Sequence, residues 1–223
     1  MLTQHTLQFL TNLSQNNNRE WFNANRNDYE KTKVEFEALC QDVLTGVAQF
    51  QDNLLNTKVK DCIFRINRDV RFAKDKSPYK KNISAAFGQG GRHSEKVDFY
   101  LHVQPHETFL GGGMWAPTTS QLASFRQEID YNPQHIKGII ENKDFREYYN
   151  EISGERVKKM PKGYAIDHPE IELLKYKQLF FIHRYSDEEV LGKNFAQEII
   201  NGCQILKPYL DYINHLFFET ERN

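Results

Sequence analysis

The stretch from Phe64 to Asn82, FRINRDVRFAKDKSPYKKN, concentrates cationic side chains. From Arg65 to Lys81 it holds seven cations and two anions, an excess of 7 − 2 = +5 in a chain whose formal net charge is −1. Arginine and lysine hold phosphate and carboxylate groups through charge-assisted hydrogen bonds. Because the whole chain is close to neutral, recognition of an anion must be local, and this segment is where we expect it.

The first half of this segment is predicted to continue a strand that starts near Lys60 and reads KDCIFRIN. A period of two then places Arg65, Asp69 and Arg71 on one face, about 6 to 7 Å apart at Cα. Phe72 falls on the opposite, apolar face. In that row Asp69 can fix one or both guanidinium groups in an orientation suited to a bidentate grip on an anion.

The second half, AKDKSPYKKN, is predicted to be a loop, since Pro78 fixes φ and favours an extended Ser77. Its lysines could converge on an anion, with Tyr79 as a stacking or hydrogen-bonding partner. The alternative is a solvated charged loop whose Arg–Asp pair only fixes the strand end. The predicted anion contacts of the whole segment, with Asp69 orienting them, are Arg65, Arg68, Arg71, Lys74, Lys76 and Lys80.

A second candidate for anion contact is the run of three glycines before Trp115. A glycine turn between a strand and a capped helix can present backbone N–H groups to an anion, which makes Gly112 and Gly113 candidate ligand contacts. Neither a P-loop nor a dinucleotide fingerprint is present. The alternative is a bulge or a close backbone crossing.

Tyr100 and His102 lie on the polar face of the predicted strand VDFYLHVQP, together with Gln104. A histidine and a tyrosine beside arginines could transfer protons, so these two are the candidate catalytic residues. The alternative is a half-exposed polar sheet face. The pair His102 and His106 spans Pro105 at a strand end, where a four-residue spacing does not align side chains, so no metal site is predicted.

Three stretches of the chain resemble one family. They are NNREWFNANRNDYE from Asn17, the basic segment itself, and YLHVQPHETFLGGGMWAP from Tyr100. Together they resemble the mainly bacterial domain-of-unknown-function family 2461, with its pattern F-R-I-x-R-D-x-R-F-[SA]-K-D-K-x-P-Y-K. The later KMPKGYAIDHPEI resembles the K-x-P-[KR]-G-Y segment of that family. The resemblance spans nearly the whole chain and implies one domain, but it brings no established activity.

The order of the predicted elements indicates the fold class. Helical patterns come first, then strand candidates with short connections, then helices again, which favours an α+β fold. We expect an antiparallel meander with the N-terminal and C-terminal helices packed on it. The strand candidates are KDCIFRIN, KNISAAF before the turn GQGG, VDFYLHVQP, ETFLGGGMW and the later KQLFFIHRYS.

Helix signals support this order. An apolar stripe at spacings of 3, 4, 4 and 3 runs from Phe36 to Phe50, and Thr3 is expected to cap a first helix. Capping boxes are predicted at Thr118-x-x-Gln121 and Ser186-x-x-Glu189. A last helix begins near Asn194, and Pro208 is expected to kink or split it.

Length, composition and cysteine spacing indicate the number of domains, the location and the state of the cysteines. A chain of 223 residues with 39% hydrophobic residues is expected to be a single domain over 1–223. The first residues lack the pattern of a signal peptide, and no apolar run is long enough for a membrane span, so we expect a cytoplasmic protein without a membrane partner. Cys40, Cys62 and Cys203 lack metal or redox spacing and are expected to be buried. No cofactor is predicted.

The leading functional hypothesis is a cationic pocket for a phosphate-bearing or other anionic small ligand. Whether it is an enzyme and its oligomeric state are left open. The alternatives are a nucleic-acid-contacting module, with cations along a groove beside exposed aromatics such as Tyr79, and a protein-interaction or structural module whose ion pairs hold the sheet end. The three differ in whether the cations converge, line an open surface or pair with one another.

Overall fold

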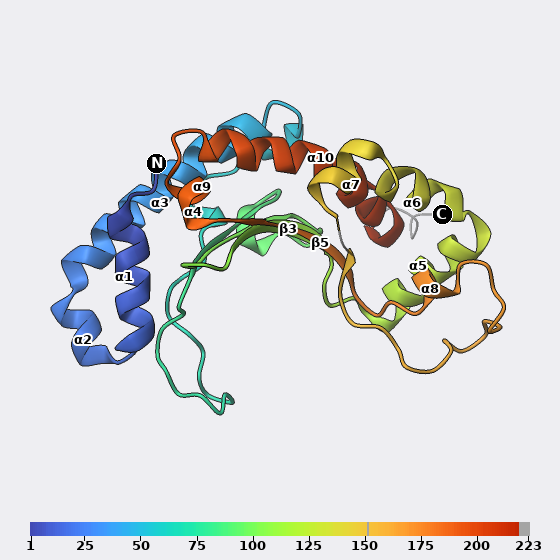
Figure 1. Cartoon of the computed structure of the whole chain (residues 1–223), viewed down its shortest axis with the longest axis horizontal. Helices are drawn as coiled ribbons and strands as arrows, with labels where there is room; N and C mark the ends of the chain where they lie inside the picture. The colour runs from blue at the N-terminus through green and yellow to red at the C-terminus, as the bar shows by residue number, and fades with distance from the viewer. Residues whose placement is uncertain (151, 219–223) are drawn as a thin grey trace. The chain divides into compact units, whose positions relative to one another are not determined.

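The computed structural model describes residues 1–150 and 152–218. Within these ranges the chain forms ten α-helices, two short 3-10 helices and five strands (Figure 1). The strands are β1 (Ile83–Phe87), β2 (Phe99–Val103), β3 (Thr108–Met114), β4 (Ile152–Ser153) and β5 (Leu179–Tyr185). The helices are α1 (Gln4–Gln15), α2 (Arg19–Ala24), α3 (Arg26–Val47), α4 (Val59–Cys62), α5 (Thr119–Tyr131), α6 (Pro133–Ile140), α7 (Lys143–Tyr148), α8 (Ile171–Leu174), α9 (Asp187–Leu191) and α10 (Phe195–Phe218), with 3-10 turns η1 (Asp52–Leu54) and η2 (Gly91–His93).

The strands form an antiparallel sheet in the order β1-β2-β3-β5-β4. Strands β1, β2 and β3 are neighbours in chain order, as the predicted meander requires. Gly90 and Gly91 after β1 have φ of 81° and 68°, which confirms the glycine turn predicted there. With helices before and after the strands, the α+β prediction is confirmed.

Contacts within the chain group it into two compact units, each built from three stretches of sequence. Unit 1 consists of Met1–Ser94, Phe99–Leu110 and Arg184–Cys203, and unit 2 of Glu95–Asp98, Gly111–His183 and Gln204–Asn223. The expectation of a single domain over 1–223 stays a prediction.

The core of unit 1 lies between helix α3 and the strands. Phe36, Leu39, Val43 and Val47 of the predicted stripe are buried, whereas Phe50 lies beyond the end of α3 and is half-buried. Helices α3 and the first part of α10 lie on one side of β1 to β3 (Figure 1).

Helix α1 is tied to α3 through a carboxylate. The N–H and the hydroxyl of Thr3 donate to Glu35 at 2.9 and 2.8 Å, and the hydroxyl of Thr6 donates at 2.7 Å. Thr3 is the N-cap residue of α1, as expected, but its hydroxyl donates to Glu35 and makes no capping hydrogen bond.

The strand predicted over residues 60–67 is wrong. Its first residues belong to α4, and the chain beyond makes only isolated bridges, from Ile63 to Ala85 and from Asn67 to Tyr79. Arg92 explains the difference. One nitrogen of its guanidinium group donates to the carbonyls of residues 60, 61 and 63, at 2.9, 2.9 and 3.2 Å. These carbonyls are thereby satisfied without a neighbouring strand.

In unit 2 the core is strongly aromatic. Phe181 of β5 contacts Phe145 and Tyr209 edge to face, at centroid distances of 4.8 and 4.9 Å. The Tyr209 hydroxyl donates to the Leu179 carbonyl at 2.7 Å, so a fully buried phenol is satisfied. Pro208 lies inside α10, which is continuous from Phe195 to Phe218, so the proline does not split the helix.

The two predicted capping boxes are confirmed. Thr118 and Gln121 form the capping box of α5, and Ser186 and Glu189 form that of α9. Each pair satisfies two backbone N–H groups that a helix start leaves without partners.

The three glycines lie inside strand β3, within the predicted strand ETFLGGGMW, so the glycine turn proposed after the strand is wrong. A Cβ added to Gly111 would lie 2.5 Å from the carbonyl oxygen of Phe181, and one added to Gly113 would lie 2.7 Å from that of Leu179. Gly113 also has φ of 134°. The close backbone crossing, the alternative drawn from the sequence, accounts for glycine at these positions.

Candidate functional site

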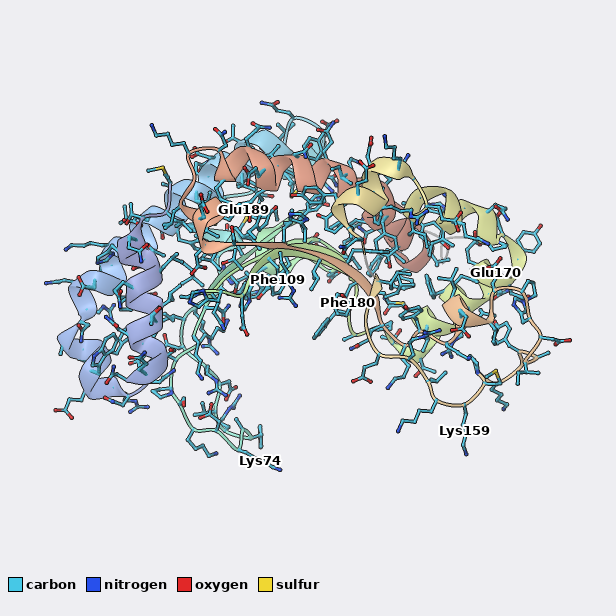
Figure 2. The ribbon with its side chains drawn as sticks, in the orientation of Figure 1. Lys74, Phe109, Lys159, Glu170, Phe180 and Glu189 are labelled. Atoms are coloured by element: carbon cyan, nitrogen blue, oxygen red, sulfur yellow. The ribbon has the colours of Figure 1, made fainter. Side chains whose placement is uncertain are left out.

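The basic segment forms a two-legged loop, residues 64–82, which we call the basic arm. Its legs are joined by backbone hydrogen bonds from Arg68 N–H to the Pro78 carbonyl and from Lys80 N–H to the Ile66 carbonyl, at 2.9 and 2.8 Å. Figure 1 draws the arm in teal, extending away from strands β1 to β3 on the side opposite α3. Lys74 lies at the far end of the arm (Figure 2). The arm is thus a projecting element with a base near the sheet and a tip.

The second leg of the arm is docked on the N-terminal helices. The side-chain amide of Asn17 donates to the carbonyl of Tyr79 at 3.0 Å and accepts from its N–H at 3.1 Å, as a neighbouring strand would. The ring of Tyr79 stacks on Phe22 at 4.0 Å between centroids. Tyr79 is only 7% exposed, so it is a docking residue and its ring is not available to stack on a ligand.

Within the arm, two predicted anion contacts are engaged internally. Arg68 donates to the Asp75 carboxylate at 2.6 Å and to the Ser77 carbonyl at 3.0 Å. The ammonium of Lys76 donates to the carbonyls of Val70 and Arg71, at 2.9 and 3.3 Å. These contacts fix the loop between the two legs.

Asp69 and Arg71 form a bidentate pair. Nε and one terminal nitrogen of Arg71 donate to the two carboxylate oxygens, at 3.0 and 2.6 Å. The pKa of Asp69 is lowered by these side-chain bonds and by the backbone N–H of Arg71. Phe72 was expected on an apolar face, and this is wrong. Its side chain is 96% exposed, because the strand that would have buried it does not form.

Other cations of the arm remain unengaged. Within residues 1–150 and 152–218, no hydrogen bond or ion pair engages the side chains of Arg65, Lys74, Lys80 or Lys81. Arg65, Lys74 and Lys81 are exposed, whereas Lys80 is half-buried. The predicted contacts are therefore divided between the base, where Arg65 and Lys80 lie, and the tip.

Lys80 lies above an aromatic ring at the base of the arm. Its Nζ is 5.1 Å from the centroid of the Phe64 ring, within cation–π distance. Burial lowers the pKa of Lys80, and the positive charge of Arg65 lowers it further. The ammonium thus has an aromatic face and another cation as neighbours.

The catalytic candidates lie next to this base, on one face of β2. The Tyr100 ring contacts Phe64 edge to face at 6.0 Å, and its hydroxyl lies 3.4 Å from Nδ1 of His102. His102 stacks on Phe109 of β3 at 4.8 Å, with the rings 9° apart. We call Phe64, Lys80, Tyr100, His102 and Phe109 the sheet-face cluster. Phe109 is labelled on the sheet in Figure 2.

Both catalytic candidates have shifted pKa values. Burial raises the pKa of Tyr100 against a hydrogen bond with Ser84 that lowers it. Burial also lowers the pKa of His102. The charges of Lys80 and Arg184 lower it further, while the hydrogen bond with Gln104 and the charge of Glu107 oppose the shift. His102 is therefore neutral at pH 7.

A shallow depression lies between the start of α2 and the arm. It is lined by Asn17, Asn18, Arg19, Val70, Lys76, Ser77 and Pro78. It brings Arg19 near Lys76 but contains neither Arg65 nor Lys80. The cations of the arm thus do not converge in this depression.

The structure therefore brings Lys80, Tyr100 and His102 together. The charge of Arg65 acts on both Lys80 and Asp69, while Arg71, Lys74 and Lys76 lie toward the tip. Gly112 and Gly113 belong to unit 2. Sequence reasoning missed the roles of Phe64, Phe109 and Arg184. The alternation of VDFYLHVQP placed His102 on its face, but no local signal specified which ring of β3 would stack on it.

Three further properties of the described residues concern metal binding, membrane crossing and disulfide formation. Within them, no group of three or more His, Cys, Asp or Glu side chains is arranged to hold a metal ion. None of the helices in the described ranges is both long and apolar enough to cross a membrane. Cys40, Cys62 and Cys203 are buried, as predicted, and form no disulfide with one another.

Comparison with known proteins assigns the chain to a family but indicates no specific function. No curated protein and no solved structure matches the chain. The family profile described as "Conserved hypothetical protein (DUF2461)" matches residues 5–212, which include the basic arm and the sheet-face cluster. The chain belongs to this family, whose function is unknown.

Proposed function

We propose that the sheet-face cluster and Arg65 bind a phosphate-bearing or otherwise anionic small molecule. The observation that carries the proposal is the environment of Lys80. Its ammonium lies over the Phe64 ring, and within the described residues no carboxylate contacts it. A half-buried cation without a counter-ion is costly, and a bound anion would supply the missing charge.

The exposed side chain of Arg65 also supports anion binding next to Lys80. Its charge lowers the pKa of Lys80 and also that of Asp69. Its own guanidinium is solvent-exposed and makes no hydrogen bond or ion pair within the described ranges. A guanidinium fork and an ammonium together provide donors that suit the oxygens of one phosphate or carboxylate. Arg68 and Lys76, by contrast, stabilise the arm itself.

Tyr100 and His102 are the proton-transfer groups of this proposal. His102 is neutral at pH 7 and can accept a proton, and the Tyr100 hydroxyl lies 3.4 Å from its Nδ1. A bound anion next to Lys80 would also stabilise a protonated His102. Binding is proposed first, and proton transfer follows only if a ligand seats its reactive atom within hydrogen-bond reach of this pair.

The cytoplasm is the location that we propose for this activity. Three buried cysteines that form no disulfide with one another fit a reducing compartment.

The test is a thermal-shift panel of phosphate, sulfate, nucleotides and sugar phosphates against chloride at equal ionic strength. A ligand at about 100 times its Kd should raise the Tm of a chain of this size by roughly 5 to 10 °C. Lys80→Met and Arg65→Ala should abolish the rise. Lys143→Met, which removes an 82% exposed lysine of α7, is the matched control and should respond like the wild type. A Lys80→Met variant that responds like the wild type, or a panel without any rise, contradicts the proposal.

A further inference from the structure

We infer that the tip of the basic arm is a contact for single-stranded nucleic acid, with Phe72 as a platform for one base and Arg71 and Lys74 beside the flanking phosphates. This goes beyond the small-molecule proposal and uses other residues. It would give the chain a macromolecular partner.

Phe72 differs from every other ring of the arm. Tyr79 is 7% exposed and stacked on Phe22, and Phe64 is half-buried against Tyr100. Phe72 is 96% exposed. A phenyl ring that offers a face to solvent can stack on any base, because every base offers a π-face.

The loop that carries Phe72 is fixed on both sides. Before it, the carbonyls of Val70 and Arg71 accept from Lys76. After it, the carboxylate of Asp75 accepts from the N–H and the hydroxyl of Ser77, at 2.8 and 2.6 Å. A platform that is ordered before binding loses less conformational entropy when a base stacks on it.

Arg71 is fixed over one face of the ring. Its guanidinium carbon lies 5.9 Å from the centroid of Phe72, while Asp69 holds Nε and one terminal nitrogen. The side chain is still 77% exposed. A guanidinium plane beside an aromatic ring offers both stacking area and positive charge to a nucleotide. Lys74, at the far end of the arm, adds an exposed ammonium (Figure 2).

The same end of the arm argues against an anionic bilayer as the partner. Asp69 and Asp75 are 45% and 59% exposed there, and both would be pressed against lipid headgroups together with the cations. Phe72 is also the sole fully exposed apolar side chain of residues 64–82, which gives little area to insert. A flexible strand of phosphates can instead contact the cations selectively.

The experiment measures fluorescence anisotropy of labelled oligo(dT) and oligo(U), about 16 nucleotides long, with the full chain. Phe72→Ala should weaken binding about 5- to 150-fold, the range for loss of one stacked base. Phe72→Trp should retain or improve affinity, whereas Phe72→Leu should behave like Phe72→Ala. Tyr131→Ala removes an 88% exposed aromatic from the end of α5 and is the matched control, with unchanged affinity.

Salt dependence separates the two kinds of contact. Lys74→Ala should reduce the slope of log K against log[salt] by about 0.7, the value for one phosphate contact on a single strand. Phe72→Ala should leave that slope unchanged. The two oligonucleotides distinguish DNA from RNA as the source of the strand.

Several outcomes overturn the inference. One is no binding by the wild type, and another is equal affinity of Phe72→Ala and Tyr131→Ala. A third is full retention by Phe72→Leu together with binding to phosphatidylserine vesicles, which would assign the tip to a membrane surface. The tip variants should keep the anion-induced Tm rise, and Lys80→Met should keep oligonucleotide binding, so failure of one proposal is distinguishable from failure of the other.

Discussion

The ammonium of Lys80 lies 5.1 Å from the centroid of the Phe64 ring and thereby joins the two legs of the basic arm where they meet the sheet. Phe64 in turn contacts Tyr100, whose hydroxyl faces His102. The charge of Lys80 is thus linked through Phe64 and Tyr100 to the imidazole of His102 on β2. The pKa of His102 is therefore expected to report changes in the charge at Lys80.

Replacing Lys80 with Met should raise the pKa of His102. Burial is the main cause of its low pKa, but the positive charge of Lys80 lowers it further, and the substitution removes that charge. An NMR titration of the imidazole resonances measures the shift. Lys81→Met, which removes the neighbouring exposed lysine, should leave the pKa of His102 closer to its wild-type value. Equal pKa values in wild type and Lys80→Met would contradict the coupling.

The same group predicts how stability changes with pH. Because the folded pKa of His102 lies below 6.5, the unfolded chain binds the proton first as the pH falls. The contribution of His102 is therefore present in full above about pH 6.5 and is lost as the pH falls toward its folded pKa. In His102→Gln the unfolding free energy, measured by urea titration at each pH, should change less with pH over this window. The same pH dependence as in the wild type would show that His102 is not the titrating group.

Asn17→Ala should loosen the basic arm. The amide of Asn17 satisfies both the N–H and the carbonyl of Tyr79, and nothing in an alanine replaces it. We expect a loss of about 1 to 3 kcal/mol in unfolding free energy and faster hydrogen exchange at the Tyr79 amide. Asn23→Ala, at an exposed position of α2, is the control and should change neither. Unchanged exchange at Tyr79 in Asn17→Ala would mean that the stacking on Phe22 alone holds the arm.

What the sequence predicted correctly depended on local signals. Capping boxes lie within four residues, and the alternation of VDFYLHVQP reports one strand, so α5, α9 and β2 followed from the residues themselves. The strand over residues 60–67 failed because its carbonyls are satisfied by Arg92, about thirty residues away. No periodicity in residues 60–67 encodes that contact. The exposure of Phe72 was missed for a related reason. The strand alternation predicted for residues 60–67 was extended to Phe72, which lies in a loop.

The division of the cations between base and tip also could not be read from the sequence. Spacing placed Asp69 near Arg71, and their pairing is observed. The partner of Arg68, however, is Asp75 on the other side of the loop, which depends on how the tip closes. Local pattern thus located the candidate site, while the loop closure decided which cations remain available.

Thermal unfolding should show one transition if the chain is a single domain. Each compact unit is assembled from three separate stretches of sequence, so neither is a contiguous piece that could be lost alone. Differential scanning calorimetry should give equal calorimetric and van't Hoff enthalpies. Two resolved transitions would contradict the single-domain prediction.

Two glycine-to-alanine substitutions should have opposite effects. At Gly113, with φ of 134°, a Cβ would lie 2.7 Å from the carbonyl oxygen of Leu179, so Gly113→Ala should destabilise by roughly 1 to 3 kcal/mol. At Gly138 in α6 nothing lies within 4 Å, and Gly138→Ala should stabilise by about 0.5 to 1 kcal/mol. Urea unfolding measures both. A neutral Gly113→Ala would argue against the close crossing as the reason for glycine in β3.

Glu35→Gln should destabilise the contact between α1 and α3. Burial alone would raise the pKa of Glu35, but the hydrogen bonds from Thr6 and Thr3 outweigh it and lower the pKa below the ordinary value of 4.5. The folded state therefore releases the proton more readily than the unfolded state. Its contribution is present above about pH 4.5 and is lost as the pH falls through the folded pKa.

At pH 7 we expect Glu35→Gln to lose about 1 kcal/mol of unfolding free energy, since the carboxylate is only partly buried. The difference from wild type should shrink as the pH is lowered below 4.5, because the wild-type carboxyl then becomes neutral as well. Glu37→Gln is the matched control. Its carboxylate on the same helix makes only a 3.7 Å pair with Lys33 and is 39% exposed, so it should change stability little at either pH. A loss in Glu35→Gln that does not depend on pH would mean that packing of the side chain, and not its charge, ties Thr3 and Thr6 to α3.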